Sequence, residues 1–363
     1  MKTKFWIGLS AIEQIDSSFF FALYDKFGDI EKVFNASLDE LKDIDGLSIR
    51  KVDNFLRKRD NVNPDKAYQE VLSRGIKFLT FEDEKYPKML REIADPPMML
   101  YYKGDLAACN LNRTVAFVGS RHCSLNGKIA VKQIMKGFSG TDVCVVSGLA
   151  TGIDTAAHVA AIENGVKTIG VIASGFDFVY PTGNKKLYQQ IEEGCGAIVT
   201  EYYPTFEPIK FRFPQRNRIV SGLSHGTVVV EAAIKSGALI TANLTLEQGR
   251  ELMCVPGLIN NPNTEGVYKL LKNGASIVTN AQDILSALNW EVKISEPVVQ
   301  SRDFENYGVD EKKILYTINI EPKTFDEIQS ETGLNTEKLL ELLTTLELNS
   351  VISQTADDRY RIE

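Results

Sequence analysis

Short apolar runs alternate with amphipathic stretches between residue 112 and about residue 287. Runs that are apolar throughout are typical of strands buried on both faces, and apolar residues recurring every three to four positions are typical of surface helices. The alternation predicts a parallel sheet covered by helices on both faces, which is a Rossmann-like α/β fold. The expected strands are Thr114–Gly119, Val143–Ser147, Lys167–Ala173, Ala197–Glu201, Thr227–Glu231, Glu251–Val255 and Ser276–Val278, and the expected helices lie near Gly127–Phe138, Thr155–Asn164, Asn184–Glu193, Leu239–Glu247 and Gly266–Lys272.

The first 62 residues have a helical pattern instead. Apolar positions recur at helical spacing in Ser17–Phe27, Ser37–Glu40 reads as a capping box, and Gly46 marks a turn before a second helix at Ile49–Arg59. The pattern resembles a sterile-alpha-motif (SAM) or helix-hairpin-helix module, and a helical packing domain without its own ligand is the favoured interpretation. The proline-punctuated segment Phe81–Gly104 is expected to connect this module to the sheet.

The C-terminal part also reads as helical. Three stretches, Glu311–Ile318, Thr324–Thr332 and Thr336–Glu347, precede an alternating end at Val351–Ile362. Three helices followed by a hairpin predict a winged-helix domain. A helix that reads DNA carries Arg or Lys, whereas the third helix here has three Glu and one Lys, so we expect it to contact protein or to pack on the body. The predicted domains are 1–62 (SAM-like), 63–290 (extended Rossmann-like), 291–307 (linker) and 308–363 (winged helix).

The net charge of −7 argues against a nucleic-acid partner until its distribution is considered. Between Glu305 and Glu363 there are thirteen acidic and six basic residues, which gives −7 and leaves a sum of zero for the rest of the chain. A neutral body can carry a locally basic pocket, so DNA is not excluded. The chain has no apolar run of about 18 residues, so we expect no membrane span. Five scattered cysteines without a CxxC motif suit a reducing cytoplasm, and neither a metal site nor a cofactor is expected.

Three strand-to-loop transitions hold the candidate chemistry. Gly119-Ser-Arg121 follows the first strand, Ser147-Gly-Leu-Ala-Thr-Gly-Ile-Asp154 follows the second, and Phe213-Pro-Gln-Arg-Asn-Arg218 begins a helix. Such loops gather beyond the carboxyl ends of parallel strands, where helix N-termini and Arg bind phosphate. No GxGxxG follows the first strand and no acidic residue ends the second, which disfavours a nicotinamide or flavin enzyme.

Several of these residues have plainer interpretations. Arg121 alone could be a surface residue on an ordinary turn. Asp154 could be a helix N-cap, or it could pair with His158 one turn on, either for acid/base chemistry or, as we prefer, as an internal hydrogen bond that orients the loop. Lys185 and Lys186 begin a helix, where cations oppose the helix dipole unless a phosphate lies nearby.

The segment Phe211–Arg218 is the most unusual part of the chain. Its three arginines are interleaved with two aromatic residues, which is what single-stranded nucleic acid requires: phosphate neutralisation together with faces for base stacking. The alternative is that these arginines form salt bridges at the edge of the sheet.

Taken in order, these motifs resemble the bacterial DNA-processing family DprA, also called Smf. The resemblance runs from Tyr86-Pro-Lys-Met-Leu90 through VAFVGSR, SGLATGID, YPTGN, FPQRNRIVSGLS and SGALIT to Val255-Pro-Gly257 and Gly266–Ala275, about half of the chain. It implies an extended Rossmann domain, commonly flanked by SAM-like and winged-helix domains. It also implies a non-catalytic protein that binds single-stranded DNA, protects incoming strands during natural transformation and loads the RecA recombinase. The family is usually a homodimer through the Rossmann domain.

The resemblance also implies a set of site residues. Arg121 corresponds to the DNA-binding arginine, Gly119 and Ser120 shape its pocket, and either Lys185 or Lys186 supplies a further cation. The full expected DNA-binding set is Gly119, Ser120, Arg121, Gly148, Gly152, Asp154, Asn184, Lys185, Lys186, Phe211, Arg216, Asn217 and Arg218.

One alternative comes from a related class of sheets, the lysine-decarboxylase-like nucleoside monophosphate phosphoribohydrolases. Their PGGxGTxxE loop is echoed by Ser224-His-Gly-Thr-Val-Val-Val-Glu231, with Gly226, Thr227 and Glu231 in matching positions but without the PGG. A nucleotide-sensing scaffold is a third possibility.

Overall fold

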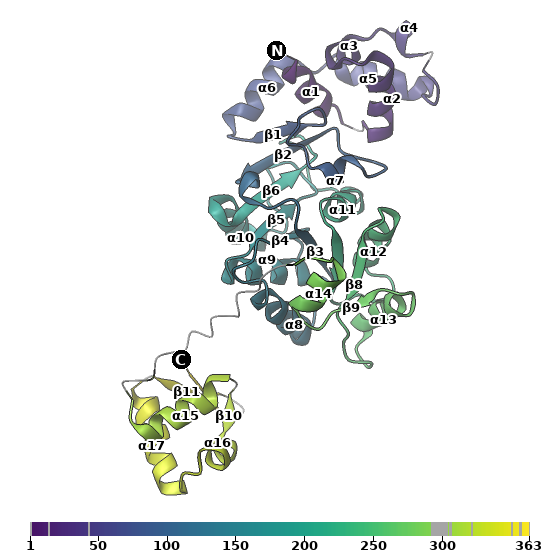
Figure 1. Ribbon diagram of the computed structural model, residues 1–363. Coiled ribbons are helices and arrows are strands. Elements are labelled where there is room, and N and C mark those ends of the chain that lie inside the picture. Colours follow the sequence, from purple (N-terminus) through teal and green to yellow (C-terminus); the bar gives the residue numbers. More distant parts are fainter. Residues whose placement is uncertain are drawn as a thin grey trace. The chain divides into compact units, whose positions relative to one another are not determined.

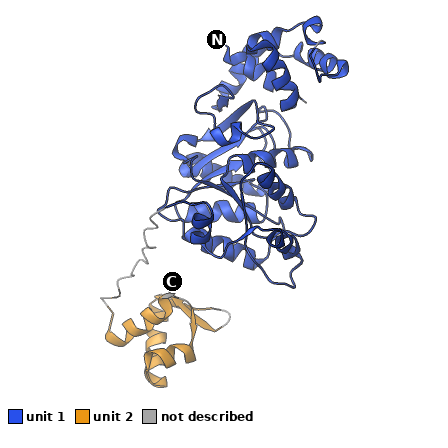
Figure 2. Cartoon of the chain, turned by 45° about the vertical axis from the view of Figure 1, so that its right-hand side comes forward, with its two compact units in different colours: residues 1–295 blue, residues 296–363 orange. Residues whose placement is uncertain are grey.

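The computed structural model describes the chain as two compact units, residues 1–295 and 296–363 (Figure 2). The described residues are 2–13, 15–42, 44–291, 304, 307–320, 322–349, 351–355 and 358–362, with only the backbone of Ile320. The predicted linker at 291–307 therefore lies almost entirely outside the described residues. No helix among them is both long and apolar enough to cross a membrane.

A nine-stranded sheet forms the centre of the first unit (Figure 1), with the strand order β1-β2-β6-β5-β4-β3-β7-β8-β9. Strands β3 to β9 are parallel to one another, as the sequence predicts. The strands are β1 (Lys77–Thr80), β2 (Met99–Gly104), β3 (Thr114–Val118), β4 (Cys144–Ser147), β5 (Lys167–Val171), β6 (Gly196–Thr200), β7 (Gly226–Val229), β8 (Glu251–Cys254) and β9 (Ser276–Ile277).

Helices cover both faces of this sheet. Apolar residues of α8, α9, α10 and α14 pack on one face, and those of α7, α11, α12 and α13 pack on the other. The bounds are α7 (Lys88–Arg91), α8 (Leu125–Lys136), α9 (Ile153–Glu163), α10 (Lys185–Gln190), α11 (Arg212–Gly222), α12 (Gly237–Glu247), α13 (Glu265–Lys272) and α14 (Ala281–Ala287), with short turns at Leu106–Ala108, Thr182–Asn184, Ile191–Cys195 and Pro262–Thr264. The expected Rossmann-like domain is confirmed.

The edge strands β1 and β2 correct the interpretation of Phe81–Gly104 as a mere connector. Strand β2 runs antiparallel to β6 and carries β1 at its outer edge. The apolar core of the N-terminal helices continues into this edge, because Met99 and Tyr101 of β2 belong to the same cluster as Trp6 and Phe20. The Tyr101 hydroxyl also hydrogen-bonds to Ser10.

The N-terminal helices are α1 (Thr3–Ser10), α2 (Ser17–Phe27), α3 (Ile30–Asn35), α4 (Leu38–Leu41), α5 (Ile49–Arg59) and α6 (Pro64–Ser73). The capping box is present, with Ser37 and Glu40 bonding each other's backbone N–H groups. The assignment of this part as a separate SAM-like domain stays a prediction, since it forms one compact unit with the sheet.

The second unit contains α15 (Val309–Ile320), β10 (Lys323–Thr324), α16 (Phe325–Thr332), α17 (Thr336–Leu348), β11 (Ile352–Gln354) and β12 (Arg359–Ile362). Its three strands form an antiparallel sheet in the order β10-β12-β11. The helices and the hairpin lie where the sequence predicts them, and the short strand β10 was not expected. The winged-helix assignment stays a prediction.

Candidate functional site

A crevice opens where the strand order of the sheet reverses. The chain moves from β3 to β4, β5 and β6 on one side and to β7 and β8 on the other, so the loops after β3 and β7 diverge at this point. Ligands of open α/β sheets bind in such crevices. The crevice holds a cavity of about 580 Å³, lined by Val118, Gly119, Arg121, Gly148, Ala150, Asp154, Tyr180, Lys210, Phe213, Pro214, Arg216, Asn217, Val220, Ser236, Gly237, Ala238, Ile240 and Thr241.

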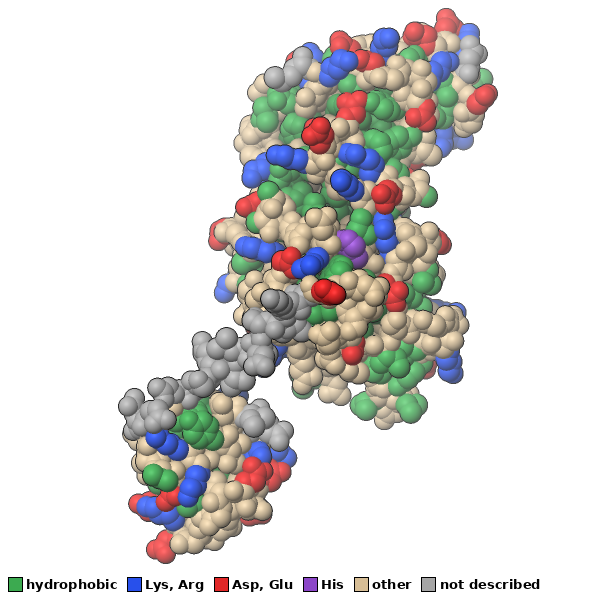
Figure 3. All heavy atoms as spheres, viewed as in Figure 1, with side chains coloured by type: hydrophobic (Ala, Val, Ile, Leu, Met, Phe, Trp, Pro, Cys, Tyr) green, Lys and Arg blue, Asp and Glu red, His purple; other side chains and the backbone are tan. Residues whose placement is uncertain are grey.

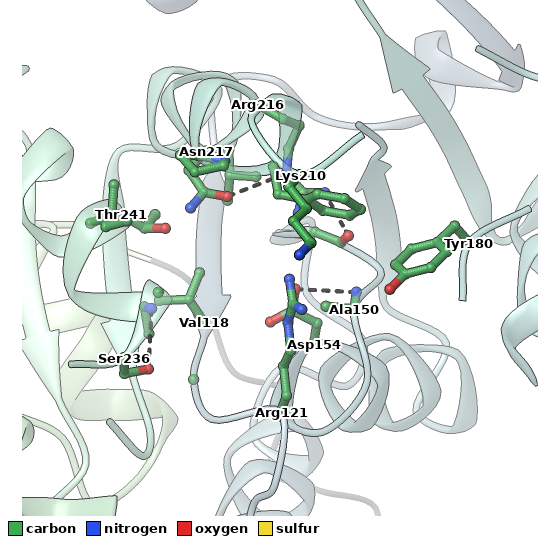
Figure 4. A pocket seen from close by; sticks show the side chains of 18 residues that line it. Val118, Arg121, Ala150, Asp154, Tyr180, Lys210, Arg216, Asn217, Ser236 and Thr241 are labelled. Atoms are coloured by element: carbon green, nitrogen blue, oxygen red, sulfur yellow. Dashed lines mark hydrogen bonds between the residues drawn. The ribbon is translucent and has the colours of Figure 1, made fainter. Parts of the chain in front are cut away.

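Two exposed cations face the crevice from opposite walls. Figure 4 shows the Lys210 side chain and the Arg121 side chain pointing toward one another, with the Tyr180 hydroxyl turned toward the same space. Neither cation forms an ion pair with a described residue, and the recorded contact of Arg121 is with the Phe213 ring, 5.5 Å from the guanidinium carbon to the ring centroid. The buried Asp154 carboxylate attracts Arg121, but the charged lining as a whole remains positive, so a bound anion would reduce the repulsion between Arg121 and Lys210.

The third cation of the crevice, Arg216, is held rigidly. The residue is 4% exposed, and its guanidinium donates to the backbone oxygens of Gly148, at 2.5 Å, and Val171. Burial lowers the pKa of Arg216 and raises the pKa of the Asp154 carboxyl, although the two charges attract each other. With three cations and one carboxylate, the charged side chains of the lining sum to +2.

Helix N-termini add to this positive potential. The first turns of α9, α11 and α12 supply Asp154, Phe213 and Gly237 to the lining. The first N–H groups of a helix have no partner within the helix and carry partial positive charge, which favours anions. The crevice is therefore suited to phosphate.

Glycines allow the loops to approach one another closely here. A Cβ on Gly148 would lie 2.6 Å from the Arg216 guanidinium, and a Cβ on Gly119 would lie 2.5 Å from the Ile153 side chain. Gly152 has a φ of +83°, and a Cβ there would collide with the Ser120 carbonyl oxygen. Any side chain at these positions would displace the residues that shape the cavity.

The expected pairing of Asp154 with His158 is wrong. The His158 Nδ1 lies 2.7 Å from the Thr168 hydroxyl on β5, while the Asp154 carboxylate accepts from the Ala150 N–H at 3.3 Å. Asp154 is also not the N-cap of α9, which is Gly152. His158 is fully buried, and burial lowers the pKa of its imidazole to about 3. It therefore supports the fold behind the crevice as a neutral group.

Comparison with known proteins places the chain in a family. A family profile described as DNA recombination-mediator protein A matches residues 77–289. The chain is 44% identical over 231 residues to the DNA processing protein DprA of Streptococcus pneumoniae, which covers 64% of this chain and 79% of that protein. It is 34% identical over 323 residues to protein Smf of Escherichia coli, covering 87% and 85%. The chain belongs to the DprA/Smf family of DNA-processing proteins.

Solved DprA structures share its fold. The S. pneumoniae DprA structure aligns with a TM-score of 0.68 at 37% identity, covering 77% of this chain and 95% of that one. The DprA of Helicobacter pylori, described for its single-stranded DNA binding mode, aligns with a TM-score of 0.53 at 31% identity, covering 59% and 95%.

The crevice brings together about half of the residues that the DprA/Smf resemblance singles out, namely Gly119, Arg121, Gly148, Asp154, Arg216 and Asn217. Gly152 and Ser120 shape the crevice from behind: the Ser120 hydroxyl accepts from the His122 N–H at 3.1 Å, and its carbonyl accepts from Ile153.

Other expected contacts of this DprA/Smf member lie outside the crevice. The Arg218 guanidinium is buried and paired with Glu201 at 2.6 Å and Asp95 at 2.9 Å, which is the salt-bridge alternative. The Asn184 side chain is also buried and donates to the Leu149 carbonyl at 2.9 Å. Lys185, Lys186 and Phe211 are exposed, but none of them lines this cavity.

Lys210 is the residue that sequence reasoning missed in this DprA/Smf member. It stands just before the segment Phe211–Arg218 and belongs to none of the family motifs. The available signal was its position as a fourth cation next to a cluster of three arginines.

Proposed function

We propose that this DprA/Smf protein binds single-stranded DNA, with the strand's phosphates held in the crevice. The observation that carries the proposal is the convergence of Arg121 and Lys210, neither of which forms an ion pair with a described residue, over a cavity whose charged lining sums to +2. The rings of Phe213 and Tyr180 pack against each other, 5.3 Å between centroids, and offer an aromatic corner to a base. Cations beside aromatic faces are the arrangement that binds single strands.

The shape of the cavity favours a single strand over a duplex. A cavity enclosed by loops after β3, β4 and β7 admits a base only if that base is turned out of a helix, and a single strand does this at lower cost. On the face displayed in Figure 3, Lys and Arg side chains are interspersed with Asp and Glu.

The cellular role is proposed from the family. We infer that the protein protects incoming single strands and loads RecA onto them during natural transformation and recombination, that it acts in the cytoplasm, and that it is a homodimer through the Rossmann-like sheet. We also infer that it has no catalytic turnover. The support is membership of a DNA-processing family and the crevice geometry, in which the buried Asp154 is attracted by Arg216 and the buried His158 hydrogen-bonds to Thr168.

The phosphoribohydrolase alternative loses support from the position of Glu231. Its carboxylate accepts hydrogen bonds from the backbone N–H and the hydroxyl of Ser124, at 2.8 and 2.5 Å, and so holds the N-cap residue of α8. It is buried and does not line the cavity, whereas a catalytic carboxylate must reach the substrate.

Equilibrium binding tests the proposal directly. Labelled oligo-dT and a matched duplex are titrated with the wild-type protein and Arg121→Ala across a range of salt concentrations. We expect tight single-strand binding that weakens with salt and falls several-fold or more in the variant. Weak binding that is insensitive to Arg121 would contradict the proposal, and hydrolysis of nucleoside monophosphates would then be assayed.

A further inference from the structure

A second cavity adjoins the crevice on the other side of the first turn of α11. It has a volume of about 260 Å³ and lies between the N-terminal helices, the ends of β2 and β6, and the start of α11. It is lined by Ser10, Ile12, Ile15, Asp16, Ser17, Phe20, Met98, Met99, Glu201, Tyr202, Phe206, Phe211, Arg212 and Gln215. We call it the aromatic pocket, because Phe20, Tyr202, Phe206 and Phe211 supply four of its walls.

The charges of the aromatic pocket are already paired. Arg212 lies 3.2 Å from the carboxylate of Glu13, and Asp16 lies 3.0 Å from the ammonium of Lys51. Glu201 pairs with the buried Arg218. The one cation in this lining, Arg212, already pairs with Glu13, whereas Arg121 and Lys210 in the crevice form no ion pair with a described residue. A flat, uncharged group with an aromatic face matches this lining better than an anion does.

Phe211 lines the pocket and is 55% exposed. The Arg212 guanidinium carbon lies 5.9 Å from the Phe211 ring centroid and 5.0 and 4.9 Å from the rings of Tyr202 and Phe206, so one cation contacts three aromatic rings. An exposed ring beside a pocket offers an aromatic face on which a base can stack.

The two cavities share one wall. Phe213, Arg216 and Asn217 of α11 line the crevice, while Arg212 and Gln215 of the same helix line the aromatic pocket. These residues belong to the same two helical turns, so both cavities are lined by the beginning of α11.

We propose that the aromatic pocket binds a nucleobase of the same strand, next to the nucleotide held in the crevice, with Phe211 stacking on it. The inference rests on the proposed function. It assigns the N-terminal helices a direct part in DNA binding, because Ile12, Asp16 and Ser17 form one side of the pocket. The phosphates remain on the crevice side, and the pocket receives only the base.

Phe211→Ala separates stacking from charge. We expect its affinity for an oligo-dT of about 12 nucleotides to fall about 5- to 150-fold, the range for one stacked base, with an unchanged dependence on salt. Phe211→Tyr, which keeps the aromatic face, should retain binding. Ile259→Ala is the matched control, because Ile259 is an exposed apolar residue, 89% accessible, that lines neither cavity. An unchanged affinity in Phe211→Ala, with Arg121→Ala still weakened, would overturn the inference and leave the proposed function standing.

The wall of the aromatic pocket that the N-terminal helices form is tested by introducing a negative charge there. Ser17 and Ser18 are neighbours in the first turn of α2, where a carboxylate is favourable to the helix, but only Ser17 lines the pocket. Ser17→Glu should therefore weaken oligo-dT binding several-fold, whereas Ser18→Glu should not. Equal behaviour of the two variants would overturn the assignment of this wall. Failure of the wild-type protein to bind any single strand would instead refute the proposed function. A peptide would then be tested as the ligand of the aromatic pocket.

Discussion

Removing Arg121 and Lys210 singly and together tests whether the two side chains hold one phosphate between them. They approach the same space from the loop after β3 and from the segment before α11, and neither has an ion-pair partner among the described residues. If they share a phosphate, either single variant keeps that phosphate neutralised by the remaining cation. The double variant then loses the contact entirely.

The magnitude follows from counterion release. Each phosphate neutralised on a single strand contributes about −0.7 to the slope of log affinity against log salt, so one contact changes affinity roughly 2.6-fold between 50 and 200 mM salt. We expect Arg121→Ala and Lys210→Ala each to weaken binding several-fold with nearly the wild-type slope. The double variant should weaken binding by more than the product of the two and have a slope shallower by about 0.7.

Fluorescence anisotropy with labelled oligo-dT at four or more salt concentrations measures both quantities. Lys272→Ala serves as the control, because Lys272 is an exposed cation on α13 that lines neither cavity. A double variant whose slope is shallower by about 1.4 would refute the shared phosphate and indicate two independent contacts. Wild-type affinity in all three variants would refute the crevice as the binding site.

Three further predictions concern stability. The His158 imidazole has a pKa of about 3 in the fold against about 6.5 in the unfolded chain, so the unfolded state binds more protons between these pH values. The free energy of unfolding therefore falls as the pH drops, by about 2 kcal/mol at pH 5. Chemical denaturation of His158→Gln should show a smaller fall over the same pH range. Gly152→Ala should lower the free energy of unfolding by about 2 kcal/mol or more because of its positive φ, while Gly183→Ala, with open space around it, should lower the melting temperature little. Arg218→Ala leaves the largely buried Glu201 carboxylate without its partner and should cost about 3 kcal/mol, with oligo-dT affinity retained well below the melting temperature; a parallel loss of affinity would place Arg218 at the DNA.

Local signals in the sequence predicted much of the fold. Helix α2 and helix α5 begin and end at the expected residues because their apolar spacing and serine or aspartate caps are encoded within a dozen positions. The parallel strands were recognisable as unbroken apolar runs. Strand β1 was missed because it is short and partly exposed, and β2 was missed because it follows Pro96 and Pro97 and pairs with β6, about a hundred positions further along the chain.

The site was predictable where a motif fixes the backbone conformation. It was not predictable where a side chain's position depends on a partner that is distant in the sequence. Gly119 and Gly148 mark the crevice directly in the sequence. The partner of His158 is Thr168 on the next strand, not the carboxylate one helical turn away, and the partner of Arg218 is Glu201 at the end of β6. Lys210 was missed because it belongs to none of the family motifs, and nothing in the sequence distinguishes it from other exposed lysines.

The division of the crevice into a rigid floor and a solvent-facing rim has a consequence for how this protein can vary. Gly119, Gly148 and Gly152 are each pressed against another element, so replacements there disturb the fold itself. Arg121 and Lys210 are exposed, and neither belongs to the buried core. Substitutions at Arg121 and Lys210 can therefore raise or lower the affinity for single-stranded DNA without destabilising the folded state. Closely related members of the family can evolve different affinities on one unchanged scaffold.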